Sequence, residues 1–328
     1  MLYCDADGEL KVLPDDGFPT EKDLQTFVEK HLDTLLQLRF IATEFVVNEH
    51  NRIDTLAYDD ESNAFVVIED KNVRNSSLVD QGFAYLSAIL DRKEKLVLKF
   101  NLVTGESRTE KDFEWSQSRI VFISPEFTER QISATSFGDM PFELYELRKY
   151  GNTYSWRNLT KKIRDKTPRP VASKCTKIAD DPLSEIKVYS EDDIIDESNP
   201  AFSQYIQLRE KVSEFPDVSI SVLKSGIKFK INGKRFGEID VTGVTKTKFD
   251  VLVANGDQIK DPTGLLIDIS NRKWGNLKHR IVMNPDTDVD AVVHLLKQSY
   301  DVSRKSQRWC WHECGSTNEK RYHRHSDW

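Results

Sequence analysis

The stretch RIDTLAYDDESNAFVVIEDK, residues Arg52–Lys71, decides the fold of the first half of this chain. Ile53–Tyr58 and Phe65–Ile68 are rich in apolar and β-favouring residues, which is typical of strands. The polar residues 59–63 between them are typical of a turn. The stretch therefore predicts a β-hairpin.

The register of this hairpin decides which charged side chains meet. If it closes with Asp59 opposite Ala64, Asp54 falls opposite Glu69, and Lys71 shares the face of Glu69 because side chains alternate along a strand. Directly opposed Cβ atoms lie roughly 4.5–5.5 Å apart, and opposed like charges destabilise a hairpin unless something compensates them. A divalent cation would do so, and Mg²⁺ prefers carboxylate oxygens. The register predicts a metal site; an ordinary charged surface hairpin is the alternative.

Length and composition limit the class of protein. The chain has 328 residues, 31% of them charged, a net charge of −7 and a mean hydropathy of −0.56. This length allows two domains, and no apolar run is long enough to span a membrane. The acidic N-terminus lacks a signal-peptide layout, so we expect an intracellular, cytoplasmic protein. Four cysteines in a chain of this size do not predict a disulfide framework.

The sequence around the hairpin predicts a mixed α/β sheet with helices on its faces. Thr20 and Asp23 fit a capping box that opens a helix running to about Leu38. A second helix begins near Ser77 and runs to about Asp91. The predicted strands besides the hairpin are Phe40–Val47, Lys95–Val103, Ser118–Ser124 and, last, Phe142–Tyr150.

Two helix residues are candidates for supporting the acids. Glu21 lies near the apolar stripe of the first helix, where it could add a third acid to the site. A carboxylate that stabilises the helix dipole is the alternative. Gln81 shares a helix face with Tyr85, four residues on, and could orient a water or contact a phosphate. A surface amide is the alternative for Gln81.

Several motifs within residues 20–150 carry a family resemblance: HLDTLLQLRFIATEF, RIDTLAYD, VVIEDK, DQGFAYLSAIL and FISPEF with ELYELRKYG. Together with the spacing D-x(14)-E-x-K, they resemble the NucS-like, RecB-like nuclease domain of the PD-(D/E)XK superfamily. The resemblance implies a metal-dependent nuclease that hydrolyses DNA, in repair or in defence against foreign DNA. It implies that Asp54, Glu69 and the backbone carbonyl of Asp70 hold Mg²⁺ or Mn²⁺, with catalytic Lys71 beside them and supporting roles for Gln81 and Glu21.

The chain departs from the family pattern at two positions. Relatives favour an apolar or aromatic residue at the middle of the ExK triplet, where this chain has Asp70, and a basic residue after the lysine, where it has Asn72 with Arg74 nearby. By alternation Asp70 points to the other face of the sheet, so it needs a partner there or the strand must end. An inactive nuclease fold that binds nucleic acid or protein is therefore an alternative function.

The whole chain is expected to divide into four parts. We expect residues 1–156 to form the nuclease-like domain, 157–198 a linker, 199–304 a smaller α+β domain and 305–328 a tail. The motifs DPTGLLIDIS, KWGN and LLKQSYD of the third part are similar to a domain of unknown function. Its predicted elements are a helix over Phe202–Phe215, strands over Ser219–Leu223, Ile227–Ile231, Gly237–Val241, Phe249–Val253, Leu265–Ile269 and Arg280–Met283, and a final helix through Tyr300.

Partners are predicted with their alternatives. DNA is the expected partner of the nuclease-like domain, and the sequence also allows a homodimer. The α+β domain could bind a protein or a small ligand. Basic residues alternate with apolar ones in that domain, which gives either a phosphate-binding sheet face or a solvated one: Lys224, Lys228, Lys230, Lys234, Arg235, Lys246 and Lys248. The tail carries potential zinc ligands, with a poorly ordered terminus as the alternative: Cys310, His312, Cys314, His323 and His325.

Overall fold

The computed structural model describes residues 2–6, 9–71, 78–135, 140–160, 182–231, 233–241, 248–270 and 277–305. The predictions for Asn72, Arg74, Ser77, Lys246 and the Cys/His tail lie outside these residues. Contacts divide the chain into two units, Met1–Asp193 and Ile194–Trp328. Among the described helices, none has the length and apolarity that crossing a membrane requires.

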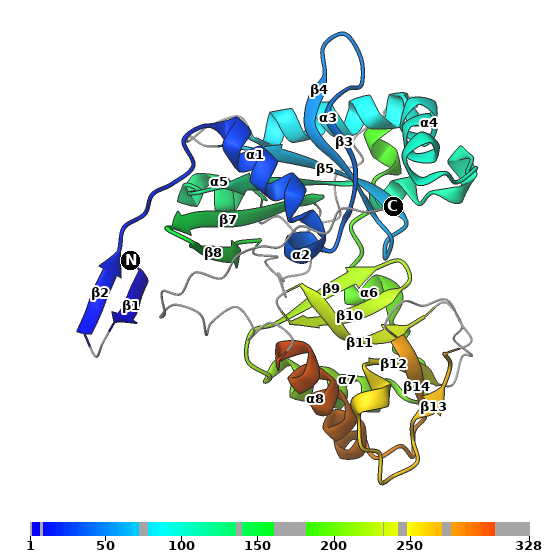
Figure 1. Ribbon diagram of the computed structural model, residues 1–328. Coiled ribbons are helices and arrows are strands. Elements are labelled where there is room, and N and C mark those ends of the chain that lie inside the picture. The colour runs from blue at the N-terminus through cyan, green and yellow to red at the C-terminus, as the bar shows by residue number, and fades with distance from the viewer. Residues whose placement is uncertain are drawn as a thin grey trace, which may run out of the picture. The chain divides into compact units, whose positions relative to one another are not determined.

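The first unit is built on a six-stranded mixed sheet with the strand order β3-β4-β5-β6-β7-β8 (Figure 1). β3, β4 and β5 pair antiparallel, β5, β6 and β7 pair parallel, and β8 returns antiparallel. The strands are β3 (Arg39–Val46), β4 (Arg52–Asp59), β5 (Ala64–Asp70), β6 (Arg119–Ser124), β7 (Phe142–Tyr150) and β8 (Thr153–Asn158). A separate two-stranded sheet, β1 (Leu2–Ala6) and β2 (Glu9–Leu13), precedes them.

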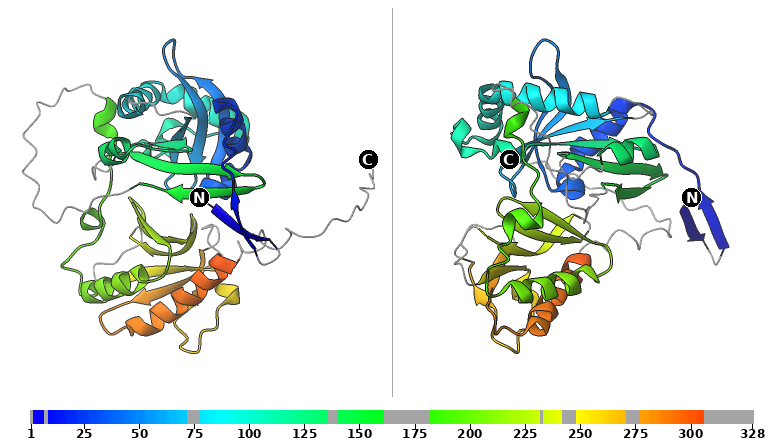
Figure 2. Two further views of the ribbon diagram at one scale, coloured as in Figure 1. Left: turned by 90° about the vertical axis from the view of Figure 1, so that its left-hand side faces the viewer. Right: turned by 180° about the vertical axis from the view of Figure 1, so that it is seen from behind.

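Helices cover both faces of the six-stranded sheet, as Figures 1 and 2 show. α3 (Leu78–Asp91) and α4 (Lys93–Thr104) pack on one face with Phe65 and Val67 of β5. α1 (Glu21–Lys30) packs on the other face with Val66 and Ile68. Alternate residues of one strand thus belong to two cores, and the predicted mixed α/β architecture is confirmed.

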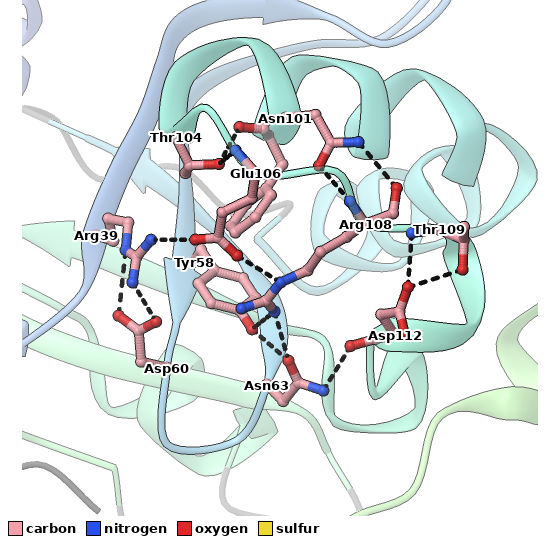
Figure 3. A network of polar contacts seen from close by, with 11 residues as sticks. Arg39, Tyr58, Asp60, Asn63, Asn101, Thr104, Glu106, Arg108, Thr109 and Asp112 are labelled. Atoms are coloured by element: carbon pink, nitrogen blue, oxygen red, sulfur yellow. Dashed lines mark hydrogen bonds and ion pairs between the residues drawn. The ribbon is translucent and has the colours of Figure 1, made fainter. Parts of the chain in front are cut away.

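The predicted hairpin register is confirmed. Asp59 pairs with Ala64 and Thr55 with Ile68, so Asp54 comes next to Glu69 at the far end of the hairpin. At the turn end, Arg108 donates from one guanidinium nitrogen to the Tyr58 hydroxyl at 2.7 Å and to Oδ1 of Asn63 at 3.0 Å (Figure 3). The Tyr58 hydroxyl also bonds Asn63.

Aromatic rings and a second arginine complete this turn network. The Arg108 guanidinium lies 5.0 Å from the ring centre of Phe100 and 5.5 Å from that of Tyr58. Arg39 donates to Asp60 at 2.6 Å and to Glu106 at 3.1 Å (Figure 3). These contacts fix the hairpin to α4 and to the loop that follows α4.

Three predictions about the first unit are wrong. Residues 95–103 are helical, within α4, because Leu96, Val97 and Phe100 are buried at helical spacing. The first helix ends at Lys30, and the short α2 (Leu32–Leu36) follows. β7 is not the last strand, since β8 pairs with it.

The predicted linker is partly structured. It contains the 3₁₀ turn Pro182–Glu185 and the short helix α6 (Glu191–Ile194), and β8 extends into it to Asn158. Leu183 and Ile186 pack against the core that α3 and α4 cover. Apolar side chains at these two positions explain why this part of the segment folds onto the first unit.

The second unit is a six-stranded antiparallel sheet with α7 (Phe202–Ser213) and α8 (Val289–Lys305) packed on one face. The predicted helices and strands are found with shifted ends. The strand order is β13-β14-β12-β11-β10-β9, and the strands are β9 (Val218–Leu223), β10 (Gly226–Ile231), β11 (Lys234–Asp240), β12 (Phe249–Ala254), β13 (Ile267–Asp268) and β14 (Leu277–Met283).

The sheet face of this unit for which the sequence left a phosphate-binding and a solvated role open is mixed in charge. Lys228 is 1% exposed, pairs in register with Glu238 and lies 3.9 Å from its carboxylate. Arg235 binds the same carboxylate at 2.5 Å. Arg280 pairs with Asp250 at 3.2 Å. Glu238 and Asp250, which the sequence reasoning did not place on this face, thus pair with three of its cations, Lys228, Arg235 and Arg280.

Candidate active site

The ends of β4 and β5 farthest from the hairpin turn bring the predicted acids and lysine together. Lys71 Nζ lies 2.6 Å from Oε1 of Glu69. The backbone N–H of Asp70 donates to Oδ2 of Asp54 at 3.1 Å. The hydrogen bond from Asp70 ties the Asp54 carboxylate to β5, the strand that carries Glu69. The hairpin itself therefore sets the spacing of the two acids.

Helix α3 supplies two further groups to the same face. Gln81 Nε2 donates to Oε1 of Glu69 at 2.7 Å and to the Tyr85 hydroxyl at 2.8 Å. The Tyr85 hydroxyl lies 3.3 Å from the backbone carbonyl of Arg52 and 3.5 Å from Oε1 of Glu69. The predicted supporting role of Gln81 thus has a geometric basis, and Tyr85 connects α3 to both strands.

A glycine lets α3 approach the sheet closely enough for these contacts. A Cβ atom at Gly82 would lie 2.7 Å from the ring of Phe142 and 3.2 Å from that of Phe122. Any side chain at this position would therefore push α3 away from the sheet, and Gln81 is the residue next to it.

Burial sets the protonation behaviour of the site. Removal from water, together with the neighbouring Asp54 carboxylate, raises the pKa of Glu69 to about 7. Burial also raises the pKa of Asp54, although the Asp70 N–H and the Lys71 ammonium oppose the rise. Burial opposes the charge on Lys71, but the hydrogen bond to Glu69 and the surrounding acids raise the pKa of its ammonium. The site therefore holds a positive lysine between acids that resist full ionisation.

Asp70 lies where strand alternation predicts. It is the last residue of β5 and shares the α1 face with Val66 and Ile68. Its side chain is buried, with 1% exposure, and neither carboxylate oxygen has a hydrogen-bond partner among the described residues. Burial, followed by the charges of Asp54 and Glu69, raises the pKa of this carboxyl well above its usual range.

Glu21 is the first residue of α1 and is exposed. Its charge acts on both Asp54 and Lys71, so Glu21 lies near these two residues, and its supporting role stays a prediction. Thr20 caps the helix by accepting from the N–H of Asp23. The capping arrangement thereby fixes where α1 begins and where Glu21 stands.

Sequence reasoning missed a polar layer under Asp54 on the α1 face. Gln25 Nε2 lies 2.8 Å from the backbone oxygen of Asp54 and 2.9 Å from Oε1 of Glu29. Thr55 donates its hydroxyl to the same Glu29 oxygen at 2.7 Å. The signal was present, because Glu21, Gln25 and Glu29 repeat every four residues along one helix face.

The residues at the site fit the predicted metal. Oε2 of Glu69 is buried and has no hydrogen-bond partner among the described residues, so an acceptor is left for a cation. Within that part of the chain, no group of three or more His, Cys, Asp and Glu residues could hold a metal ion. Asp54 and Glu69 alone suit Mg²⁺, which commonly uses one or two carboxylates and keeps several waters.

Comparison with known proteins finds a relative that covers most of the chain. No family model matches the chain. No solved structure matches it significantly. A protein of Haemophilus influenzae described as "Uncharacterized protein" is 32% identical over 301 residues, which cover 91% of this chain and 98% of that protein. The chain therefore belongs to the same family as this Haemophilus influenzae protein.

Proposed function

We propose that the protein is a metal-dependent nuclease of the PD-(D/E)XK fold that hydrolyses phosphodiester bonds of DNA. The observation that carries the proposal is the cluster of Asp54, Glu69 and Lys71 on one hairpin, with Gln81 bonded to Glu69. A surface hairpin has no need to bury Glu69, which is 2% exposed, against a second carboxylate.

The topology supports the fold assignment. An antiparallel trio, β3-β4-β5, continues into a parallel trio, β5-β6-β7, with helices on both faces. The acids stand at the end of β5 that leads towards α3, and α3 adds Gln81. This arrangement is compatible with the fold that the sequence motifs resemble.

Each residue has a chemical task in the proposed reaction. Asp54 and Glu69 would hold the metal, together with the backbone carbonyl of Asp70. Bound Mg²⁺ or Mn²⁺ would supply charge stabilisation at the scissile phosphate and would lower the pKa of a water. The Lys71 ammonium would stabilise negative charge that develops on the phosphate. Gln81 and Tyr85 would hold Glu69 in its orientation.

Two observations favour a second function. Asp70 is a buried carboxylate without a hydrogen-bond partner among the described residues, and the pKa of Glu69 is raised to about 7. Both features oppose a fully charged acid cluster. A nuclease fold that binds nucleic acid without cutting it is therefore the alternative.

Cleavage assays separate the two functions. The substrates are labelled single-stranded, duplex and branched DNA and RNA, with Mg²⁺, Mn²⁺ or EDTA. Asp54→Asn and Lys71→Ala are compared with Asp60→Asn, an acid at the other end of the same hairpin. The proposal predicts metal-dependent cutting of DNA that the first two substitutions abolish and the third preserves. A folded wild type that binds these substrates and cuts none supports the alternative.

A further inference from the structure

Glu44, in the edge strand β3, has an unusual backbone for a strand residue. Its φ is 44°, a left-handed value that is rare for a residue other than glycine, and the register of β3 on β4 leaves it opposite Asp54. This left-handed residue breaks the alternation of side chains along β3. Thr43 contacts Gln25 of α1, and the next side chain, Glu44, contacts Lys22 of the same helix. Regular pleating would instead aim a third carboxylate at the face of Asp54. The left-handed residue therefore removes Glu44 from the acid cluster.

The redirected carboxylate holds two cations beside Asp54. Glu44 lies 2.6 Å from Lys22 Nζ and 3.2 Å from a guanidinium nitrogen of Arg52. Lys22 also donates to Oε1 of Gln25, whose Nε2 binds the backbone oxygen of Asp54. Arg52 comes two residues before Asp54 on the same strand, so alternation gives both the same face. The cations thus flank Asp54 from the helix and from the strand.

Both cations have capacity for another ligand. The Lys22 and Arg52 side chains are 56% and 65% exposed. An ammonium keeps one N–H beyond its contacts with Glu44 and Gln25, and a guanidinium with a single ion pair keeps most of its donors. Exposed ion pairs contribute little free energy, so a phosphate can share these donors with Glu44 at small cost.

We propose that Lys22 and Arg52, tied together by Glu44, bind a backbone phosphate of the nucleic-acid strand next to the scissile bond. This inference rests on the proposed nuclease function and specifies how that site takes its substrate. The contact recognises the charge and spacing of the backbone phosphates and not the identity of the bases. Phosphate contacts position a protein on a nucleic acid without carrying sequence information.

Arg39 provides a matched control. It is an exposed arginine of the same sheet, held by two acids, Asp60 and Glu106, at the opposite end of the hairpin. Binding of labelled single-stranded and duplex DNA in EDTA is measured by fluorescence anisotropy over a range of salt concentrations. The full-length wild type is compared with Lys22→Ala, Arg52→Ala, Lys22→Arg and Arg39→Ala, each first shown by thermal unfolding to be folded at the assay temperature.

The expected result is a smaller salt dependence for two of the variants. Each of Lys22→Ala and Arg52→Ala lowers the slope of log Kd against log salt by about 0.7–0.9, whereas Lys22→Arg and Arg39→Ala keep the wild-type slope. Slopes for Lys22→Ala and Arg52→Ala that equal the wild-type slope overturn the inference, and so does a wild type that binds neither DNA.

Cleavage with Mg²⁺ or Mn²⁺ distinguishes this failure from failure of the nuclease proposal. If the wild type cuts DNA and KM is unchanged in Lys22→Ala and Arg52→Ala, the phosphate contact is ruled out and the nuclease proposal stands. If the wild type does not cut but the salt-dependence slopes are as expected, the nuclease proposal is ruled out and the phosphate contact stands.

Discussion

The two ends of the β4–β5 hairpin differ in how completely their charged groups are paired. At the turn end, Arg39 and Arg108 bind acids and polar groups, and the network closes on Tyr58 and Asn63 (Figure 3). At the open end, carboxylates outnumber cations, and the buried oxygens of Asp70 lack hydrogen-bond partners among the described residues.

This contrast separates stability from function within one element. A buried polar group without a hydrogen-bond partner costs free energy, so folded proteins usually pair such groups. At the turn end, Tyr58, Asn63 and Arg108 follow that rule, because their polar groups are paired with one another. The open end departs from it, and such departures tend to cluster where a protein binds a ligand or catalyses a reaction. The turn network thus holds together the same two strands that carry the acid cluster at their other end.

The largest expected effect is on activity at the open end. Glu69→Gln is predicted to lower the cleavage rate by on the order of 10³-fold, because the substitution removes an anionic metal ligand. At pH 7.5 the free energy of unfolding should not fall, because the pKa of Glu69 is raised to about 7 in the folded protein, so its ionisation opposes folding and the neutral glutamine avoids that cost. Single-turnover cleavage and urea unfolding test both statements. Asp60→Asn is the control, and equal rates for the two variants would contradict the assignment.

A smaller effect, on stability, is expected at the turn end. Arg108→Ala should lower the free energy of unfolding by about 2 kcal/mol, since it removes hydrogen bonds to Tyr58 and Asn63 and a cation held over aromatic rings. Chemical denaturation measures the loss. Cleavage by the folded fraction should stay near wild type, and a variant as stable as wild type would show that the network does not hold the hairpin.

Asp70→Asn is expected to stabilise the protein by about 1–3 kcal/mol at pH 7.5, because ionisation of the buried Asp70 carboxyl costs free energy that a neutral amide avoids. The pKa of Asp70 is raised in the folded protein, so its contribution to stability is present below the ordinary pKa and is lost as pH rises through the folded value. The advantage of Asp70→Asn should therefore shrink towards pH 4. Thermal unfolding without metal, from pH 4 to 8, measures it, and an advantage that grows on acidification would contradict the assigned burial.

The smallest effect is expected for Arg39→Ala. Its ion pairs with Asp60 and Glu106 are partly exposed, so the loss should stay below about 1 kcal/mol. Comparison with Arg108→Ala by denaturation in low and high salt sharpens the contrast within the turn network. Losses of equal size and equal salt dependence would mean that the aromatic contacts of Arg108 add nothing.

The sequence could predict that the side chains of the candidate site lie together, because their positions depend on local structure. Hairpin register follows from the turn and from strand periodicity, so Asp54, Glu69 and Lys71 could be brought together without tertiary information. Gln81 and the Thr20 cap follow helix spacing and capping chemistry in the same way. The second unit was predictable for the same reason, since its antiparallel strands are consecutive hairpins over most of their length.

The errors arose where tertiary packing overrides a local pattern. Leu96, Leu98 and Phe100 alternate with other residues as in a strand, but burial against the sheet selects a helix whose outer side leaves Leu98 61% exposed. The partners of Arg108 come from segments up to 50 residues away, and periodicity does not indicate such contacts. The left-handed backbone of Glu44 follows from no residue preference.

Gly82 has a consequence for how this family can vary. Its position against Phe142 and Phe122 links the identity of a helix residue to the size of two strand residues. An alanine could enter at 82 only alongside a smaller side chain at 142, so the two positions should change together among homologues or not at all. Homologues that keep the acids of β4 and β5 but break this pairing would have α3 at a different depth, and their glutamine would be out of reach of the glutamate.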